Sequence, residues 1–200
     1  MDKIFNLDNK FFSAINKWID MCILSILWII FSLPIITIGA STIALYHATF
    51  KVIREERGEL VKEFWRGFYQ NLKQSILLTI FVLMIGTVYH IDIMLIKQLN
   101  TKNNIMLVLI LLLTISLGFV ACSIFYMIPY IARFSTSMKM IMINSFLIGI
   151  RHILTTLLLV LWTCFITMIC FYIPILILII PCIYMFFLSV MVEKIFDKYQ

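Results

Sequence analysis

The chain has 200 residues, of which 63% are hydrophobic and only 13% are charged, and its formal net charge is +6. So few polar side chains cannot coat a globule of this size, which excludes an ordinary soluble domain. The basic residues stand between apolar stretches and not along one sustained face, so we expect a lipid bilayer and no nucleic acid as the partner.

The N-terminal segment, about 3–18, mixes apolar and charged residues at a helical spacing, and this predicts an interfacial helix. Both signs of charge precede the first apolar run, and that run is longer than the apolar core of a signal peptide. The segment is therefore expected to be a retained anchor and not a cleaved signal.

The apolar runs predict an all-α membrane protein with five transmembrane helices, because about 20 apolar residues are needed to cross a bilayer. The interval 153–192 contains no Asp, Glu, Lys or Arg. As one helix it would be about 60 Å long, which is about twice the bilayer core, so we expect two crossings joined by a turn at 172–174. The predicted spans of this single domain, 1–200, are about 21–45, 75–96, 105–131, 153–172 and 174–192.

The distribution of Lys and Arg predicts the orientation of these spans. With five crossings, the segments 51–74 and 133–152 and the C-terminal tail share one side, which holds 11 of the 16 Lys and Arg residues. The cytoplasmic side of a membrane protein carries the excess of these residues. The expected orientation has the N-terminus outside and the C-terminus inside.

Small side chains line one face of the first span. Ala40, Ala44 and Ala48 recur every four residues, and Gly39 and Ser41 widen the stripe. Small residues let a second helix approach closely inside a membrane. Two interpretations stay open for this stripe: packing within the chain, and a surface for a partner protein or a second copy.

The segment that follows the first span predicts a cytoplasmic amphipathic helix, about 59–74. Its helical spacing gathers five apolar side chains on one face and basic side chains elsewhere around it. Such a helix lies on the inner leaflet or docks in a groove of a cytoplasmic partner. The apolar face consists of Phe64, Trp65, Phe68, Tyr69 and Leu72, and the inner-leaflet basic residues are Lys62, Arg66 and Lys73.

The sequence contains few residues that could form a catalytic or metal-binding site. No charged residue lies near the middle of a predicted span, and His90 with Asp92, near the outer end of the second span, form the one candidate polar site. The five cysteines all fall inside apolar runs, unlike the paired cysteines of zinc sites. We therefore predict no catalytic residues, no metal and no cofactor.

Two stretches of the chain echo each other. Tyr46 and Arg54, eight residues apart, correspond to Phe125 and Arg133, and the pairs Phe68/Lys73 and Phe146/Arg151 share one offset. A parallel repeat of two hairpins would produce this pattern. Chance in so apolar a sequence would also produce it.

Residues 33–46, LPIITIGASTIALY, with FWRGF at 64–68 and NLKQ at 71–74, resemble the YesL-like family of bacterial integral membrane proteins, a domain of unknown function. The resemblance covers nearly the whole chain and is firmest over 28–78. Members are commonly encoded beside carbohydrate ABC-transporter components and sugar-degrading enzymes. The resemblance implies a bacterial plasma-membrane protein and gives no catalytic or binding residues.

From these observations we expect a non-enzymatic accessory protein of a carbohydrate ABC-type uptake system, docking to the permease or to another membrane protein. The alternative is a small transporter or channel, acting alone or as a homo-oligomer. Its polar path would have to come from the hydroxyl groups inside the spans. These belong to Thr37, Ser41, Thr79, Thr87, Thr114, Ser116 and Thr163.

Overall fold

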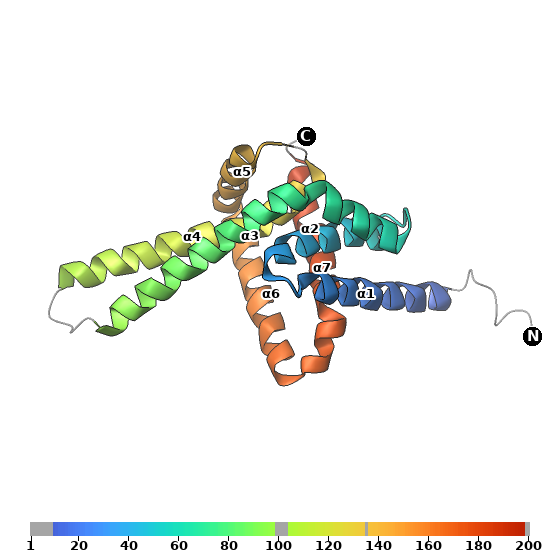
Figure 1. Ribbon diagram of the computed structural model, residues 1–200, viewed down its shortest axis with the longest axis horizontal. Helices are drawn as coiled ribbons and strands as arrows, with labels where there is room; N and C mark the ends of the chain where they lie inside the picture. Colours follow the sequence, from blue (N-terminus) through green and yellow to red (C-terminus); the bar gives the residue numbers. More distant parts are fainter. Residues whose placement is uncertain (1–9, 99–103, 135, 199–200) are drawn as a thin grey trace, which may run out of the picture.

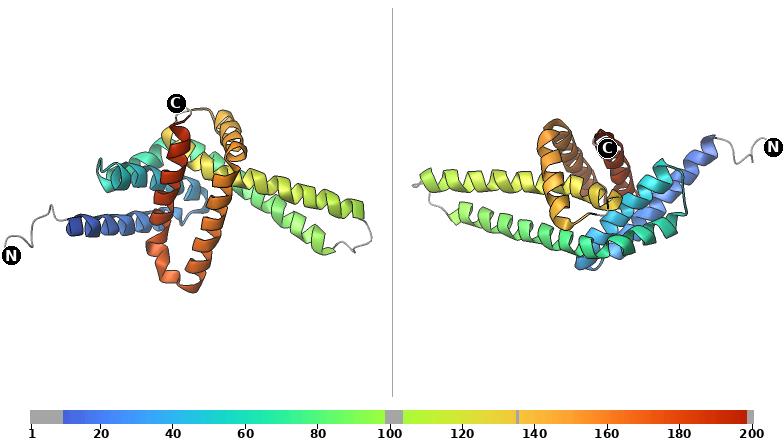
Figure 2. Two further views of the ribbon diagram at one scale, coloured as in Figure 1. Left: turned by 180° about the vertical axis from the view of Figure 1, so that it is seen from behind. Right: turned by 90° about the horizontal axis from the view of Figure 1, so that it is seen from above.

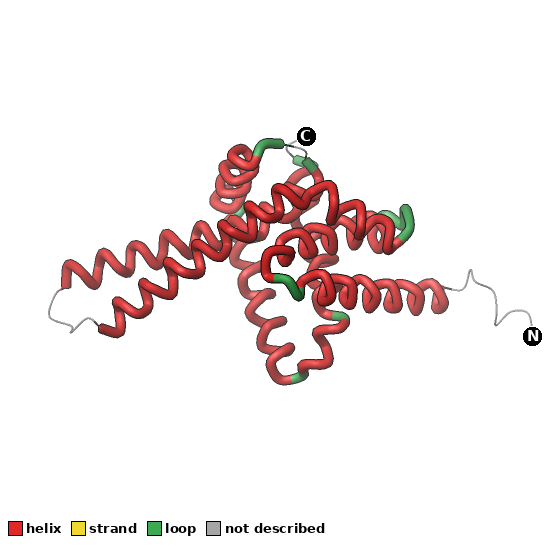
Figure 3. The backbone as a smooth tube through the Cα atoms, in the orientation of Figure 1, coloured by secondary structure: helices red, strands yellow, loops and turns green. Residues whose placement is uncertain are grey.

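All elements of the computed structural model are helical, and it describes residues 10–98, 104–134 and 136–198 (Figures 1 and 3). The predicted interfacial helix over 3–18 therefore lies partly outside the described residues. The elements are α1 (Lys10–Ser32), the 3₁₀ turn η1 (Ile35–Thr37), α2 (Ile38–Ala48), the π-helical turn η2 (Thr49–Arg54), α3 (Leu60–Gln98), α4 (Asn104–Arg133), α5 (Met138–Arg151), α6 (Ile153–Tyr172), the 3₁₀ turn η3 (Pro174–Leu178) and α7 (Ile180–Phe196).

Five stretches of the described chain are long and apolar enough to cross a membrane, which agrees with a multi-pass membrane protein. They do not coincide with the five predicted ranges, because the first predicted span contributes to two of them. The five stretches are Ile15–Ser32, Ile35–Arg54, Leu60–Leu95, Leu111–Arg133 and Ile153–Tyr172.

The predicted continuous helix over 21–45 is wrong, because the chain reverses after Ser32. Pro34 has an extended backbone (φ −75°, ψ 123°) and no N–H to continue the helix. The Thr37 hydroxyl contacts the Phe31 and Pro34 carbonyl oxygens, each at 2.8 Å. α2 then runs back along α1, and the Ser32 and Ser41 hydroxyl oxygens lie 2.6 Å apart.

The predicted cytoplasmic helix over 59–74 is not a separate element. It forms the first turns of α3, a continuous helix of 39 residues that is about 58 Å long by helical rise. The turn before it contains Gly58, whose positive φ of 84° suits a residue without a Cβ. The amphipathic stretch and the second predicted span therefore form one continuous helix.

The end of the chain also differs from the prediction. α6 covers the residues predicted for the fourth span, whereas the range 174–192 begins with the 3₁₀ turn η3. Pro174 and Pro181 each stand at the start of a helical element, where the missing N–H costs nothing. α7 therefore starts only at Ile180 and continues to Phe196.

α2 is the centre of the fold, and most of its residues are buried. The first half of α3 packs along α2, and the second half of α3 leaves the core as a long hairpin with α4 (Figures 1 and 2). The α6–α7 hairpin lies at a steep angle to these helices (Figures 1 and 2). Close approach between α2 and α3 needs Gly39, because a Cβ there would lie 2.6 Å from the Ser75 carbonyl oxygen.

One ion pair joins α1 to the segment before α3. Lys17 Nζ, near the start of α1, lies 2.5 Å from Glu56 Oε1 in the segment before α3. The reversal at Pro34 accounts for this contact, because it brings the start of α1 beside the segment before α3.

Candidate functional site

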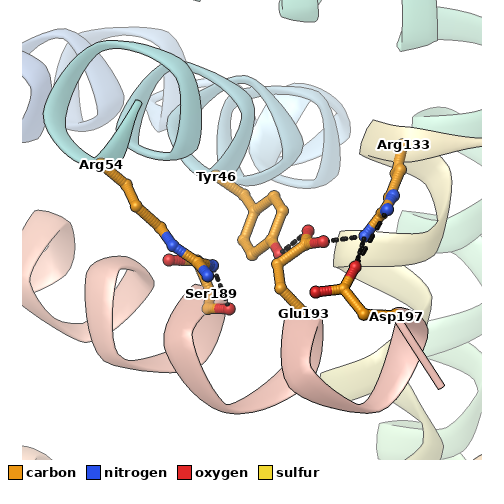
Figure 4. Close-up of polar contacts among 6 residues, drawn as sticks. All are labelled: Tyr46, Arg54, Arg133, Ser189, Glu193 and Asp197. Carbon is orange, nitrogen blue, oxygen red and sulfur yellow. Dashed lines mark hydrogen bonds and ion pairs between the residues drawn. The ribbon is translucent and has the colours of Figure 1, made fainter. Parts of the chain in front are cut away.

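Polar side chains from four elements meet at one end of the core, where α2, η2, α4 and α7 come together (Figure 4). In this junction the helix after Ala48 widens to π geometry over Thr49–Arg54. Such π-turns are rare and are frequently found at functional sites. We call Tyr46, Arg54, Arg133, Ser189, Glu193 and Asp197 the polar junction.

Glu193 is the centre of the polar junction and is only 2% exposed. The Tyr46 hydroxyl donates to its Oε1 at 2.9 Å, and the Arg133 guanidinium pairs with its Oε2. A buried carboxylate without such partners would be strongly destabilising. The three side chains therefore tie α2, α4 and α7 together.

The two arginines of the junction both reach α7. Arg133 also contacts Asp197 at 3.3 Å and lies over the ring of Phe134, 5.5 Å from its centroid. Arg54, at the end of the π-turn, donates to the carbonyl oxygen of Ser189 at 2.8 Å. These are the two arginines that the sequence echo aligned, and both contact α7.

A second group of charges surrounds Glu63 on the first turns of α3. Its Oε2 lies 3.4 Å from Lys51 Nζ and 3.8 Å from His47 Nδ1, and its Oε1 lies 3.7 Å from Arg66 Nη1. His47 Nδ1 is also 3.2 Å from the Glu63 carbonyl oxygen. The group fixes the start of α3 to the end of α2.

A cleft of about 240 Å³ separates the two groups. Glu193 at its wall is already engaged by Tyr46 and Arg133, so its carboxylate is not available as a free general base. Within the described chain no three His, Cys, Asp or Glu side chains come together as metal ligands. The lining residues are Tyr46, His47, Phe50, Lys51, Ala132, Arg133 and Glu193.

The predicted small-residue stripe lies inside the molecule. Ala40, Ala44 and Ala48 are completely buried, as is Ser41, and the Gly39 N–H donates to Thr79 Oγ1 on α3 at 3.1 Å. A Cβ on Gly67 would lie 3.2 Å from the Ala44 Cα atom. Of the two interpretations, the partner surface is corrected: Gly39 and Ala44 lie against α3 and Ser41 against α1, so the stripe packs within the chain.

The predicted amphipathic face is divided. Phe64 and Phe68 are buried, and their rings lie 5.8 Å and 5.4 Å from that of Phe31 on α1. Leu72 is half-buried, whereas Trp65 and Tyr69 remain exposed. The basic residues Lys62, Arg66 and Lys73 are all exposed. Only the outer part of this face is therefore open to a partner.

The candidate pair His90 and Asp92 is not brought together. His90 is exposed, whereas Asp92 is 2% exposed and turns toward α4, where the Thr114 hydroxyl donates to its Oδ2 at 2.5 Å. Asp92 Oδ1 has no hydrogen-bond partner among the described residues. The contact joins the two helices of the α3–α4 hairpin.

Sequence analysis missed Glu193, Glu63 and the role of Tyr46. Glu193 is the first acidic residue after Asp92, and it directly follows the last apolar run. That position was assigned to a solvated tail. The signal that could have identified it is that Glu193 and Asp197 are the only acidic residues in the sequence after Arg133, which ends the long apolar helix α4.

Over residues 21–93 the chain is similar to a family described as protein of unknown function, DUF624. The matched region runs from within α1 to the last part of α3, so it includes Tyr46, Arg54 and Glu63 but neither Arg133 nor Glu193. Neither a curated protein nor a solved structure matches the chain.

Proposed function

We propose that this chain is a non-enzymatic accessory protein of the bacterial plasma membrane that docks to the permease of a carbohydrate ABC-type uptake system. The resemblance of residues 33–46 and 64–74 to the YesL-like family supports this proposal, because members are commonly encoded beside such systems. The match to a family of unknown function covers the same region. The docking surface is the part of this region that the fold leaves open.

The observation that carries the proposal is an aromatic strip on the first turns of α3. Val61, Trp65 and Tyr69 are 58%, 43% and 62% exposed, whereas Phe64 and Phe68 on the same helix are buried. The Trp65 and Tyr69 rings lie 5.1 Å apart in an edge-to-face arrangement. Buried residues behind the strip hold it rigid, and exposed Trp and Tyr are typical anchors of protein interfaces.

The charges around the strip fit the cytoplasmic side. Lys62, Arg66 and Lys73 lie on the same stretch of α3, and the polar junction with Arg54 and Arg133 lies at the same end of the core. Excess basic residues favour the cytoplasmic side of a membrane. We therefore propose that the strip and the end of α7 lie on the cytoplasmic side, together with the start of α1, whose Lys17 pairs with Glu56 in the segment before α3.

Site-specific crosslinking in native membranes tests the docking. A photoreactive amino acid at position 65 or 69 should crosslink permease subunits, whereas the same group at Leu154 on α6, which is 76% exposed, should not. In a deletion strain, sugar uptake should fall and should return with the wild-type chain but not with Trp65→Ala/Tyr69→Ala. Recovery of the protein alone in mild detergent, with unchanged uptake in the deletion strain, would contradict the proposal.

The alternative, a small transporter or channel, is favoured by the buried contact between Asp92 and Thr114. The hydroxyl groups of Thr37 and Ser41, also considered for a polar path, donate to nearby backbone carbonyls, and those of Thr79, Thr87 and Thr163 bond within their own helices. The Ser116 side chain lies outside the described part of the structure. Solute flux into liposomes that contain only this protein, and its loss in Asp92→Ala, would favour transport over docking.

A further inference from the structure

α5 carries an apolar face that the rest of the described chain leaves uncovered. Five of its large apolar side chains are between 38% and 57% exposed, although α5 lies outside every candidate span. Its opposite face is packed inward through Ile141 and Ser145, which are completely buried. The exposed side chains are Met140, Ile143, Phe146, Leu147 and Ile150.

This face continues into the apolar surface of the next helix. α6 begins two residues after α5 ends, and its Ile153, Leu154 and Leu157 are also exposed. α6 itself is long and apolar enough to cross a membrane. A short helix whose apolar face extends a membrane-spanning surface is typical of a helix that lies in the interface between bilayer and water.

A groove of about 390 Å³ runs along α5 where it meets the ends of α4 and α7. Its wall is aromatic: the ring centroids of Tyr130 and Phe134 lie 4.8 Å apart, and those of Phe134 and Phe196 lie 5.6 Å apart. Its polar groups come from α5, where Asn144 Nδ2 donates to the Tyr130 hydroxyl at 2.8 Å and Arg151 is exposed. A ligand for this groove therefore needs an apolar part and a polar part.

The charge around the groove indicates that the polar part of the ligand is an anion. The sequence has no Asp or Glu between Asp92 and Glu193, whereas Lys139 and Arg151 stand near the two ends of α5. The nearby carboxylate of Asp197 is engaged by Arg133. Arginine binds phosphate oxygens through two parallel N–H groups, and basic pockets at the cytoplasmic side of membrane helices bind anionic headgroups.

We propose that the groove between α4, α5 and α7 binds an anionic phospholipid, with its phosphate at Asn144 and Arg151 and its acyl chains along the exposed face of α5. An amphiphilic molecule fits both parts of the site, because the aromatic wall can contact an acyl chain and the side chains of α5 can bind the headgroup. The lipid would hold α5 in the membrane interface and would join the α4 and α7 ends of the core.

Native mass spectrometry and thermal unfolding of the purified full chain test this proposal. Phosphatidylglycerol and phosphatidylcholine with identical acyl chains would be added separately to the protein in a mild detergent. Both lipids carry the phosphate, but the choline cation of phosphatidylcholine would be repelled by Lys139 and Arg151. Phosphatidylglycerol should therefore bind at least about tenfold more tightly and should raise the unfolding temperature more. Equal binding of the two lipids would overturn the proposal.

Three variants separate the groove from general surface charge. Arg151→Gln and Asn144→Asp should each reduce phosphatidylglycerol binding about tenfold, since the first removes a cation and the second adds an anion of the same size. Leu147→Trp should reduce binding of both lipids by filling the groove. Arg57→Gln, an exposed basic residue in the turn before α3, should bind like the wild type.

Two further outcomes would assign the groove to another occupant. If inorganic phosphate at the same concentration reproduced the thermal shift, the site would take a soluble anion and not a lipid. If the protein had twice its monomer mass without bound lipid, and Leu147→Trp restored the monomer, a second copy would cover the groove. Either result would overturn the lipid proposal even if Arg151→Gln failed to fold.

Discussion

Arg133 on α4 and Glu193 on α7 form an ion pair in which the carboxylate side chain is only 3% exposed. The two residues are 60 positions apart in the sequence, and the Tyr46 hydroxyl from α2 completes the contact at 2.9 Å. Three helices that are distant in the chain therefore meet at one buried carboxylate. This relationship makes the polar junction the most sharply testable part of the fold.

Removal of one partner of this pair should be strongly destabilising. We expect Arg133→Met to lower the free energy of unfolding by about 3–5 kcal/mol, because the Glu193 carboxylate then stays in a buried site without its cation. Glu193→Gln should lower it less, because Arg133 keeps its contact with Asp197. Thermal or denaturant unfolding in a fixed detergent measures the effect.

The double variant Arg133→Met/Glu193→Gln is the control for this prediction. It should be more stable than Arg133→Met alone, because no unpaired carboxylate is left behind. If the changes in the free energy of unfolding of the two single variants simply add in the double variant, the two residues do not interact, and the polar junction does not hold α4 and α7 together.

The reversal at Pro34 predicts a specific disulfide. In a background without the native cysteines, Ser32→Cys/Ser41→Cys should oxidise readily, because the two hydroxyl oxygens lie 2.6 Å apart in the structure. A straight helix over 21–45 would separate the two positions by about 13 Å along its axis.

A gel-shift assay after limited proteolysis between the two positions measures this crosslink. Ser32→Cys/Ala48→Cys is the matched control and should stay reduced, since Ala48 lies two turns farther along α2 than Ser41. Equal oxidation of both pairs would indicate collision of mobile segments and not a fixed hairpin.

Gly39→Ala should destabilise the α2–α3 contact by about 1–3 kcal/mol, the usual effect of overpacking. The new methyl group would lie 2.6 Å from the Ser75 carbonyl oxygen, which belongs to the backbone and cannot rotate away. Gly86→Ala, in the second half of α3, is the control, because a Cβ there meets nothing within 4 Å. Its unfolding temperature should be unchanged or slightly raised, since alanine favours a helix over glycine.

Mild acid should destabilise the corner between α5 and α6. Burial, together with the neighbouring cations Lys198 and Arg151, lowers the pKa of His152 below its usual 6.5. Below about pH 6.5, His152 is protonated in the unfolded chain but still neutral in the folded chain. The free energy of unfolding therefore falls with pH until the pH reaches the folded-state pKa. The difference in unfolding temperature between pH 7.5 and pH 5.5 should be smaller in His152→Gln than in the wild type.

The sequence by itself determined that the chain is helical and membrane-bound, because uncharged runs such as 153–172 are long enough to cross a bilayer and too apolar for water. It also supplied the spacing of Ala40, Ala44 and Ala48, which packs one helix closely on another. It could not say which helix, since a stripe of small residues fits α3 and a foreign helix equally well.

Only the tertiary structure decided that α2 reverses along α1, that 59–74 continues into α3, and that Glu193 belongs with Arg133 and Tyr46. Hydropathy is calculated over a short stretch of sequence, so it does not tell in which direction the chain continues after a proline. An ion pair between positions 133 and 193 depends on the packing of α4 against α7, which no local pattern contains. The physical reason is that charge and apolar content set where a segment can lie, while side-chain contacts between distant segments set what it lies against.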